Sequence, residues 1–404
     1  MTLVVQKYGG TSVGTLERIK AVAAHIRDSR QRFKNVVVVV SAMGDRTDEL
    51  LALAHEISQD PPTREVDMLL TAGERISMAL LAIALHEVGV PSQSLTGSQS
   101  GILTDETHGN ARIIRITGER IREGISTGRV LIVAGFQGVS PLSKEITTLG
   151  RGGSDLTAIG LAQALGAQAC EIYKDVDGVF TADPRLVPDA QLLSEISWDT
   201  MRELAWAGAS VLHSRGAHVA AKFSIPLTIR SSFHPDRPGT VVKGKNNMET
   251  PKIQALAHKK NIASLTVSLT GNSAAKTLSE ASTWLWTKGE APLVTQASVI
   301  DGTLVASIVL KDDLVDGYLL SLKQTAKHSQ TNVGATNLTS GLASITVIGE
   351  GFSQAPELVT KAISALRKSP VVMEVRNSAV VFCVGASDLE EDLKSLHNKL
   401  IKNL

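Results

Sequence analysis

The sequence predicts an α/β protein in which a mostly parallel sheet is sandwiched by helices, followed by two small ferredoxin-like modules. In the first 240 residues, short aliphatic runs alternate with longer segments whose apolar residues recur at helical spacing. This alternation is typical of a parallel sheet with helices on both faces. Beyond residue 250 the order changes to strand, helix, strand, strand, helix, and that order occurs twice, which indicates a pair of modules.

The elements of the first part follow from the spacing of apolar residues. The predicted strands are continuously apolar and therefore buried on both faces; they are Leu3–Tyr8, Val36–Val40, Val130–Phe136, Cys170–Tyr173 and Leu227–Arg230. The predicted helices carry one apolar face; they run from Leu16 to Ile26 and over Glu65–Val88, Asp155–Leu165 and Thr200–Phe223. Ligands of such sheets bind beyond the carboxyl ends of the strands, where the glycine clusters of this chain fall.

A domain boundary is predicted near residue 245. The segments His234–Thr240 and Lys243–Asn247 are polar and rich in residues that break helices and strands. We expect a large domain over residues 1–245 and modules over residues 250–335 and 340–404, with an exchange of strands between the modules left open. Their predicted elements are Ile262–Leu269, Ala274–Trp286, Leu293–Leu310, Asp313–His328, Ala343–Gly349, Ala355–Lys368, Val371–Val375, Ala379–Val384 and Leu389–Leu404.

The composition excludes several functional classes. The 404 residues include 41 Lys and Arg against 40 Asp and Glu, a formal charge of +1 that lacks the basic excess of nucleic-acid or membrane-surface binders. The longest apolar run, Met78–Leu85, is far short of the ~20 residues of a membrane span, and the first residues do not resemble a secretory signal. Cys170 and Cys383 are too few for a disulfide framework and are interpreted as buried thiols. We therefore expect a cytoplasmic protein.

The segment Lys7–Ser12 (KYGGTS) directly follows the first strand and precedes the first helix. Gly9 and Gly10 let main-chain N–H groups approach an anion, and the helix N-terminus favours negative charge. A lysine at the strand end supplies a mobile cation suited to a phosphoryl group. The alternative is an ordinary turn that needs glycine.

A second glycine cluster, Leu149–Asp155 (LGRGGSD), also precedes a helix. Arg151 offers a planar fork for a carboxylate, and it is flanked by Gly150, Gly152 and Gly153. Ser154 and Asp155 are also natural helix caps, which alone could explain them.

Three further segments complete the polar set. Tyr173–Arg185 places several carboxylates after a buried strand, where they either face a ligand or are solvated turn residues. Ser41–Thr47 follows the second strand and so shares the sheet edge with Lys7 and Asp175. Glu74 sits in a largely apolar helix, where a buried carboxylate needs a positive partner such as Arg75 or a substrate ammonium. No histidine pattern predicts a metal site, and His108 and His213 are interpreted as structural or surface residues.

Taken together, these motifs resemble those of the aspartokinase family, in the same order. They are Lys7–Ser12, Ser41–Gly44 with Thr47–Leu51, Gly73–Ser77, Thr147–Asp155 and Asp175–Arg185. The resemblance covers essentially the whole first domain and extends to relatives of similar length with two carboxy-terminal ACT modules. It implies an amino-acid kinase fold and transfer of the γ-phosphoryl group of ATP to the side-chain carboxylate of L-aspartate, with Mg²⁺ arriving with ATP and no metal-binding residues of the protein's own.

The resemblance also implies roles for individual residues. Lys7 contacts the transferring phosphoryl group, Asp155 orients Lys7, and Arg151 clamps the substrate α-carboxylate. Glu74 takes the α-ammonium, and the remaining amino-acid contacts are Thr47, Gly152, Gly153 and Ser154. The nucleotide contacts are Lys7, Tyr8, Gly9, Gly10, Ser41, Tyr173, Lys174, Asp175, Phe180, Asp183, Pro184 and Arg185.

Lys174 departs from the family pattern, which usually has Thr or Ser before the Asp-Val-Asp-Gly segment. A main-chain contact to adenine tolerates this change, whereas a hydroxyl contact does not. Lys174 either reaches a phosphate or points to solvent, and the sequence favours solvent. We expect Lys174→Thr to keep activity and to shift the ATP Michaelis constant modestly.

The carboxy-terminal half departs further from the family pattern. The turn Ser268–Lys276 lacks the family's Asp-x-Pro-Gly, Gln296 is followed by Ala297 instead of Asn, and the strand from Glu374 also differs. An effector amino acid needs polar groups to replace its water, so we expect weak or absent inhibition by lysine plus threonine. ACT modules pair through their sheets, which predicts a homodimer or larger assembly. Met248 could start a separate ACT-only subunit.

Two other functions remain open at the level of the sequence. One is a related amino-acid kinase that acts on an aspartate analogue in specialised metabolism; retention of Arg151, Glu74 and Thr47 weighs against it. The other is a non-catalytic regulatory subunit; the intact Lys7 and Asp155 weigh against it. No nucleic-acid or membrane partner is expected.

Overall fold

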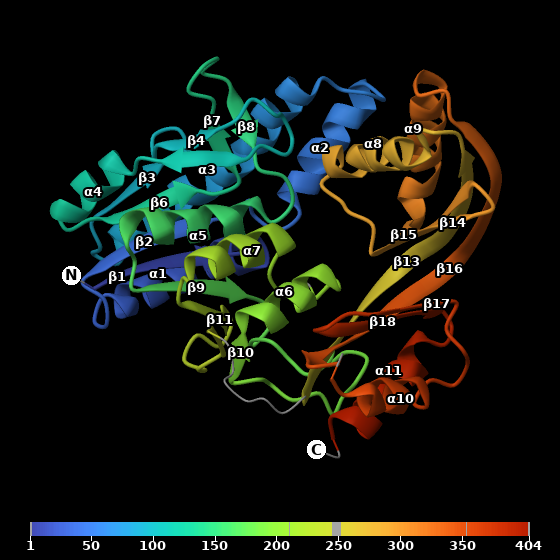
Figure 1. The fold of residues 1–404 in the computed structure, drawn as a ribbon. Coiled ribbons are helices and arrows are strands. Elements are labelled where there is room, and N and C mark those ends of the chain that lie inside the picture. Colours follow the sequence, from blue (N-terminus) through green and yellow to red (C-terminus); the bar gives the residue numbers. More distant parts are fainter. Residues whose placement is uncertain (1, 210, 245–251, 353, 403–404) are drawn as a thin grey trace. The chain divides into compact units, whose positions relative to one another are not determined.

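The computed structural model describes residues 2–209, 211–244, 252–352 and 354–402 (Figure 1). It divides into two compact units: unit 1 is Met1–Val179, Leu192–Arg202 and Ser210–Asn246, and unit 2 is Phe180–Gln191, Glu203–Ala209 and Asn247–Leu404. The predicted α/β class is confirmed. The predicted boundary near residue 245 and Met248 lie outside the described residues, and the residue ranges of the predicted domains stay a prediction.

Unit 1 is built on an eight-stranded sheet. Its order is β10 (Glu195–Ser197), β12 (Thr240–Lys243), β11 (Leu227–Ser231), β9 (Ala169–Lys174), β1 (Leu3–Tyr8), β2 (Asn35–Val40), β6 (Val130–Ala134) and β3 (Ser92–Leu95). The strands from β11 to β3 are parallel, and β12 runs antiparallel to β11. Every residue of β1 and β6 is buried, as a continuous apolar run predicts for a strand covered on both faces.

Helices cover both faces of this sheet (Figure 1). The helices of unit 1 are α1 (Leu16–Ser29), α2 (Arg46–Ile57), α3 (Thr63–Glu87), α4 (Glu119–Ser126), α5 (Gly153–Leu165) and α7 (Ser214–Phe223), and α6 (Trp198–Trp206) runs from unit 1 into unit 2. Among the described residues, α3 is the one helix long and apolar enough to cross a membrane, but 50% of its apolar window is buried inside the protein. Because α3 also packs against α1, its apolar face belongs to the core of unit 1.

A second, smaller sheet in unit 1 was not predicted. Its order is β5 (Ile113–Ile116), β4 (Ile102–Thr104), β7 (Gln137–Val139) and β8 (Ile146–Thr148). The strands have three or four residues, which is too short for a reliable pattern of alternation. The sheet matters for the site because β8 leads directly into the Arg151 segment.

The predicted helix Thr200–Phe223 is wrong. The chain forms two helices instead, because α6 ends at Trp206 and α7 begins at Ser214. Gly208 has φ +99°, a conformation that glycine adopts readily and that ends a helix. His213 then caps α7 by accepting a hydrogen bond from the main-chain N–H of Arg215.

Unit 2 contains one six-stranded sheet. Its order is β14 (Val294–Ile300), β15 (Thr303–Lys311), β13 (Lys252–Thr270), β16 (Asn332–Glu350), β18 (Ala379–Gly385) and β17 (Val372–Val375). Its helices are α8 (Ala274–Thr287), α9 (Val315–His328), α10 (Pro356–Ile363) and α11 (Leu389–Leu400). The predicted double order of strand, helix, strand, strand, helix is confirmed. The apolar run Leu293–Leu310 is a hairpin that turns at Asp301 and Gly302, both with positive φ.

The two long strands of unit 2 exceed their predicted lengths. β13 and β16 have 19 residues each and pair antiparallel along their whole length, with several bulges. The first half of β13, Lys252–Lys259, therefore lies beside the second half of β16, Ser344–Glu350. Each long strand thus contributes to both halves of the sheet. The predicted helix Ala355–Lys368 ends earlier, at Ile363.

Candidate active site

The predicted polar motifs of unit 1 meet at one edge of the large sheet. The parallel register places Tyr8 opposite both Val40 and Tyr173, so β1, β2 and β9 end side by side. The loops that follow are tied together by main-chain hydrogen bonds: Ser41 N–H donates to the Tyr8 carbonyl at 3.1 Å, and Gly9 N–H donates to the Tyr173 carbonyl at 3.3 Å. The sheet therefore assembles a polar rim from segments that are far apart in the sequence.

A buried carboxylate holds two lysines at this rim. Asp155 lies at the start of α5, and its Oδ1 is 2.7 Å from Lys7 Nζ. Its Oδ2 is 3.2 Å from Lys174 Nζ. The side chains of Asp155, Lys7 and Lys174 are 2%, 5% and 18% exposed, so the cluster is largely dry. Two ammonium groups share one carboxylate, which leaves a net positive charge for an anion.

The charges shift the pKa values of this cluster. Burial alone raises the pKa of Asp155, but the charges and hydrogen bonds of Lys174 and Lys7 outweigh it and hold the pKa well below its usual range. Burial lowers the pKa of Lys7 to about 8, against the opposing effect of Asp155. Asp155 is thus ionised, whereas Lys7 loses its charge in mildly alkaline solution.

Two glycines allow close packing at the rim. A Cβ atom on Gly10 would lie 2.9 Å from the Gly44 carbonyl oxygen and 3.0 Å from the Ala42 carbonyl oxygen. Gly152 has φ +71°, and a Cβ atom there would lie 2.2 Å from His213 Cβ. Neither position accepts a side chain without movement of the chain around it, so both loops depend on glycine.

Glu74 is a second buried carboxylate, but it forms no ion pair with any residue that the structure describes. It lies on α3, is 3% exposed and accepts a hydrogen bond from the Ala42 N–H at 3.2 Å through Oε1. Its Oε2 is buried and has no hydrogen-bond partner among the described residues. Burial raises the pKa of Glu74 to about 7. This geometry suits a cationic group that arrives with a ligand.

The other predicted amino-acid contacts lie on neighbouring segments of unit 1. Arg151 is exposed and, within the described part of the chain, forms no ion pair. Thr47 is half-buried in the first turn of α2. Ser154 is buried in the first turn of α5, beside Gly135, and Gly153 is the first residue of that helix.

Both tyrosines of the predicted nucleotide set lie in the core beneath the rim. Tyr8 and Tyr173 are fully buried and stacked on each other, with ring centroids 4.8 Å apart. The Tyr8 hydroxyl contacts His25 Nδ1 at 2.7 Å. The two rings are thus part of the core, and the role of these residues as nucleotide contacts stays a prediction. Side chains alternate along a strand, so the adjacent pairs Lys7–Tyr8 and Tyr173–Lys174 already indicated opposite faces.

The prediction that Lys174 points to solvent is wrong. Its ammonium group contacts Asp155, and only 18% of its side chain is exposed. Asp175, the next residue, is exposed. The remaining predicted nucleotide contacts, Phe180 and Asp183–Arg185, belong to unit 2, where Asp183 accepts hydrogen bonds from Arg185.

Sequence reasoning missed Asp67 and Arg215 near the Arg151 segment, and it interpreted His213 as a structural or surface residue. His213 packs on Gly152, Arg215 donates to the Leu149 carbonyl at 2.6 Å, and the fully buried Asp67 accepts from Thr148 at 2.5 Å. No local signal marked them, since their partners are 61 to 81 positions away in the sequence. His108, interpreted as structural, contacts Asp67.

The rim carries the two lysines of the Asp155 cluster and the exposed Arg151. Among the described residues, no group of three or more His, Cys, Asp and Glu could hold a metal ion. Both oxygens of Asp155 already contact lysines. This arrangement binds anions, and phosphoryl transfer between anions is the chemistry that it can assist.

A sheet of this topology with an anion-binding rim is typical of a class of phosphotransferases. Comparisons with known proteins identify the family within that class. The model of the "Amino acid kinase family" matches residues 2–231. The aspartokinase of Corynebacterium efficiens is 42% identical over 412 residues, which cover 99% of this chain and 96% of that protein. The chain belongs to the aspartokinase family.

Two further relatives support this assignment. The aspartokinase of Mycolicibacterium smegmatis is 53% identical over 270 residues, 66% of this chain and 64% of that protein. The match thus spans a little under two thirds of that relative. The crystal structure of E. coli aspartokinase III in complex with aspartate and ADP superposes with a TM-score of 0.82 at 25% identity, covering 98% of this chain and 99% of that chain.

Proposed function

We propose that the protein transfers the γ-phosphoryl group of MgATP to the side-chain carboxylate of L-aspartate, giving 4-phospho-L-aspartate and ADP. The observation that carries this proposal is the contrast between two parts of one rim. The Lys7–Asp155–Lys174 cluster has excess positive charge for phosphates, and the buried Glu74 lacks a cation that the ammonium group of an amino acid can supply. Membership of the aspartokinase family supports the choice of substrate.

The reaction needs charge neutralisation more than acid–base chemistry. A carboxylate with a reference pKa near 4 is already ionised at neutral pH, so no general base is required. The obstacle is repulsion between this anion and the triphosphate. Lys7 faces the transferring phosphoryl group, and Asp155 keeps its ammonium group in place. Mg²⁺ enters as part of the MgATP substrate, because the carboxylate nearest the rim is occupied by the lysines.

The amino acid is held at its α-carbon end. Arg151 takes the α-carboxylate through its planar fork, Glu74 takes the α-ammonium, and Thr47 and Ser154 donate hydrogen bonds. This leaves the side-chain carboxylate as the group that faces the phosphates. Glutamate is one methylene longer and places its carboxylate beyond the position for in-line attack. The nucleotide phosphates lie at the glycine loop after β1, beside Gly9, Gly10 and Ser41.

Hydroxamate trapping of the acyl phosphate tests this function. The purified protein is incubated with MgATP, hydroxylamine and one amino acid at a time: aspartate, glutamate and β-substituted aspartates. We expect aspartyl hydroxamate in large excess over the others. Preference for a substituted aspartate would indicate a related kinase of specialised metabolism, and no product with any substrate would indicate a non-catalytic regulatory subunit.

The turn before α8 in unit 2 supports a second part of the proposal, namely weak or absent feedback inhibition by lysine and threonine. The turn before α8 and the first turn of that helix contain no acidic residue to bind an effector's ammonium group. Assays of the kinase with both amino acids test this. Strong concerted inhibition at low millimolar concentrations or below would contradict it.

We also propose a homodimer or larger assembly in the cytoplasm, with a separate ACT-only subunit as a further possible partner. The edge strands β14 and β17 of the six-stranded sheet each have one neighbour. Val299, Val371 and Val375 on these edges or beside them are 70%, 53% and 46% exposed, a surface suited to association. Light scattering of the purified protein measures the assembly.

A further inference from the structure

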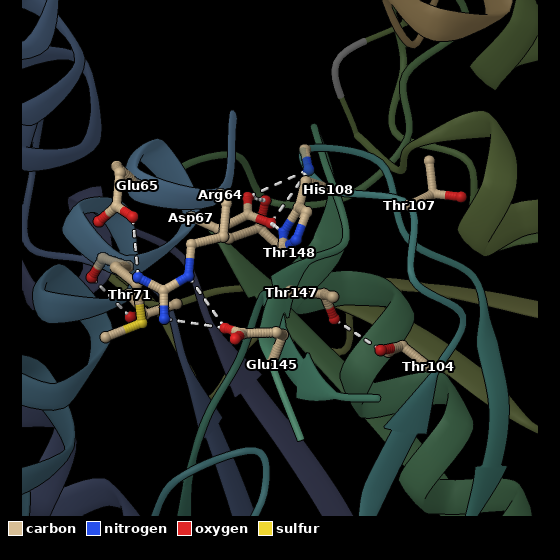
Figure 2. A network of polar contacts seen from close by, with 12 residues as sticks. Arg64, Glu65, Asp67, Thr71, Thr104, Thr107, His108, Glu145, Thr147 and Thr148 are labelled. Atoms are coloured by element: carbon tan, nitrogen blue, oxygen red, sulfur yellow. Dashed lines mark hydrogen bonds and ion pairs between the residues drawn. The ribbon is translucent and has the colours of Figure 1, made fainter. Parts of the chain in front are cut away.

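The buried carboxylate of Asp67 is the centre of a hydrogen-bond network in unit 1 (Figure 2). Its Oδ1 accepts from the Thr148 hydroxyl at 2.5 Å and from the Gly109 N–H at 3.1 Å. Its Oδ2 lies 2.7 Å from His108 Nδ1. This distance places the His108 ring within hydrogen-bond reach of the carboxylate. Donors from two other segments therefore satisfy both oxygens.

These donors hold the chain that leads to Arg151. Thr148 is the last residue of β8, and only Leu149 and Gly150 separate it from Arg151. The Thr148 carbonyl accepts from the Ala111 N–H at 2.8 Å, which ties β8 to the loop that carries His108 and Gly109. The segment that leads to Arg151 is thus held in place by hydrogen bonds to Asp67 and to the loop beside it.

Arg215, on α7, holds the same segment before Arg151 in place. Its guanidinium donates to the Leu149 carbonyl and to Asn110 Oδ1, both at 2.6 Å, and to the Ala111 carbonyl at 2.8 Å. Gly150 has φ +74°, and a Cβ atom there would lie 3.0 Å from Asn110 Oδ1. Little freedom therefore remains in the two residues before Arg151.

Asp67 also lies on the helix that carries Glu74. The two residues are seven positions apart on α3, which is about two turns, so they share one face of the helix roughly 10 Å apart along its axis. The hydrogen bond between Thr148 and Asp67 therefore joins the helix of Glu74 to β8, the strand that precedes Arg151. The exposed Arg64–Glu145 ion pair joins the same two segments one turn earlier (Figure 2).

We propose that Asp67 is a positioning residue for the amino-acid substrate: through Thr148, it sets the separation between Glu74 and Arg151. This inference rests on the proposed function, in which those two side chains take the α-ammonium and the α-carboxylate. A fixed separation of the two groups orients the substrate about its α-carbon, and so determines how far its side-chain carboxylate reaches. Asp67 thereby contributes to the selection of aspartate over glutamate without touching either.

The test is steady-state kinetics of Asp67→Asn and Thr148→Val with both amino acids. We expect the aspartate KM to rise about tenfold and the aspartate-to-glutamate ratio of kcat/KM to fall about tenfold, while the ATP KM stays within twofold. Thr148→Ser keeps the hydroxyl and restores both values to within twofold of wild type. The double variant is no worse than the more impaired single variant, because the two residues form one bond.

Thr104→Val provides the matched control. The hydroxyls of Thr104 and Thr147 form a buried bond of 2.6 Å in the same small sheet, one residue from Thr148 but independent of Asp67. This variant loses a comparable hydrogen bond. We expect it to have a lower melting temperature than wild type and an unchanged aspartate KM.

Several outcomes would overturn the inference. One is an equal change in the aspartate and ATP KM values. Another is an effect of Thr104→Val on selectivity as large as that of Thr148→Val. A third is a loss of activity in proportion to the loss of folded protein. If Asp67→Asn fails to fold, Thr148→Val and its rescue by serine decide the question. A wild-type protein that forms no acyl phosphate from aspartate would reject the proposed function itself and this inference with it.

Discussion

Asp155 and Glu74 are both almost fully buried carboxylates at the same rim, yet their surroundings are opposite. Asp155 contacts two lysines, and its pKa lies well below the usual range despite the cost of burial. Glu74 accepts a hydrogen bond from the Ala42 N–H and pairs with no cation of the described residues, and burial raises its pKa to about 7. The carboxylate of the first region has complete ion pairs before a ligand arrives, and its cluster keeps a net positive charge, whereas the second region is completed by the ligand. A carboxylate without its partner thus indicates where a cationic group binds.

The largest expected effect comes from the completed region. Lys7→Met removes the cation nearest the transferring phosphoryl group, and we expect kcat for aspartyl phosphate formation to fall about 10³-fold. Hydroxamate trapping measures this, and Lys20→Met on the exposed side of α1 serves as the matched control with unchanged kcat. Retention of a tenth or more of the turnover would contradict the role of Lys7.

The second prediction concerns the region that the ligand completes. Glu74→Gln keeps the shape but loses the charge, so the aspartate KM is expected to rise about thirtyfold, as for a charge-assisted hydrogen bond, with the ATP KM unchanged. Glu87→Gln, at the exposed end of the same helix, is the control and should leave both KM values unchanged. A parallel rise of both KM values would argue against a role in ammonium binding.

The same substitution should stabilise the fold. Because the pKa of Glu74 is raised, the folded protein binds more protons than the unfolded chain between about pH 4.5 and pH 7, and its stability falls as the pH rises through that window. Glu74→Gln lacks this titration, so its melting temperature should exceed that of wild type above pH 7. Thermal melts at several pH values measure the difference, and equal melting temperatures above pH 7 would contradict an unpaired Glu74.

The pH dependence of the kinetics separates the two regions. Glu74 must be ionised to bind an ammonium group, so kcat/KM for aspartate should fall up to about tenfold per pH unit below its pKa of about 7. Lys7 must be protonated to bind a phosphoryl group, so kcat/KM for ATP should fall above its pKa of about 8. Glu74→Gln should abolish the decrease of kcat/KM for aspartate at low pH and keep the decrease of kcat/KM for ATP at high pH. Loss of both decreases in that variant would refute the assignment of one to Glu74 and the other to Lys7.

The smallest effect is expected for the second lysine of the cluster. Lys174→Thr leaves Asp155 paired with Lys7, so turnover should stay within tenfold of wild type while the ATP KM rises about threefold, as for a partly exposed charge. Lys174→Arg keeps the charge and should behave like wild type. A loss of turnover beyond about tenfold, or ~1.4 kcal/mol, would make Lys174 a catalytic residue.

The fold and most of the candidate site could be predicted because their signals are local. Continuous apolar strands and amphipathic helices follow from the spacing of neighbouring residues, and glycine clusters after strands mark loops at one edge of a parallel sheet. The break between α6 and α7 was missed because an apolar pattern continues across it while the backbone at Gly208 does not remain helical.

Only the tertiary structure decided which charges pair. Asp155 meets Lys7 from 148 positions away and Lys174 from 19, while Glu74 meets neither, and no sequence pattern encodes that difference. The same holds for Asp67 and Thr148, which are 81 positions apart. Hydrogen bonds and ion pairs act over a few ångströms, so their partners are set by strand register and helix packing, which involve the whole chain, whereas secondary structure is set largely by neighbouring residues.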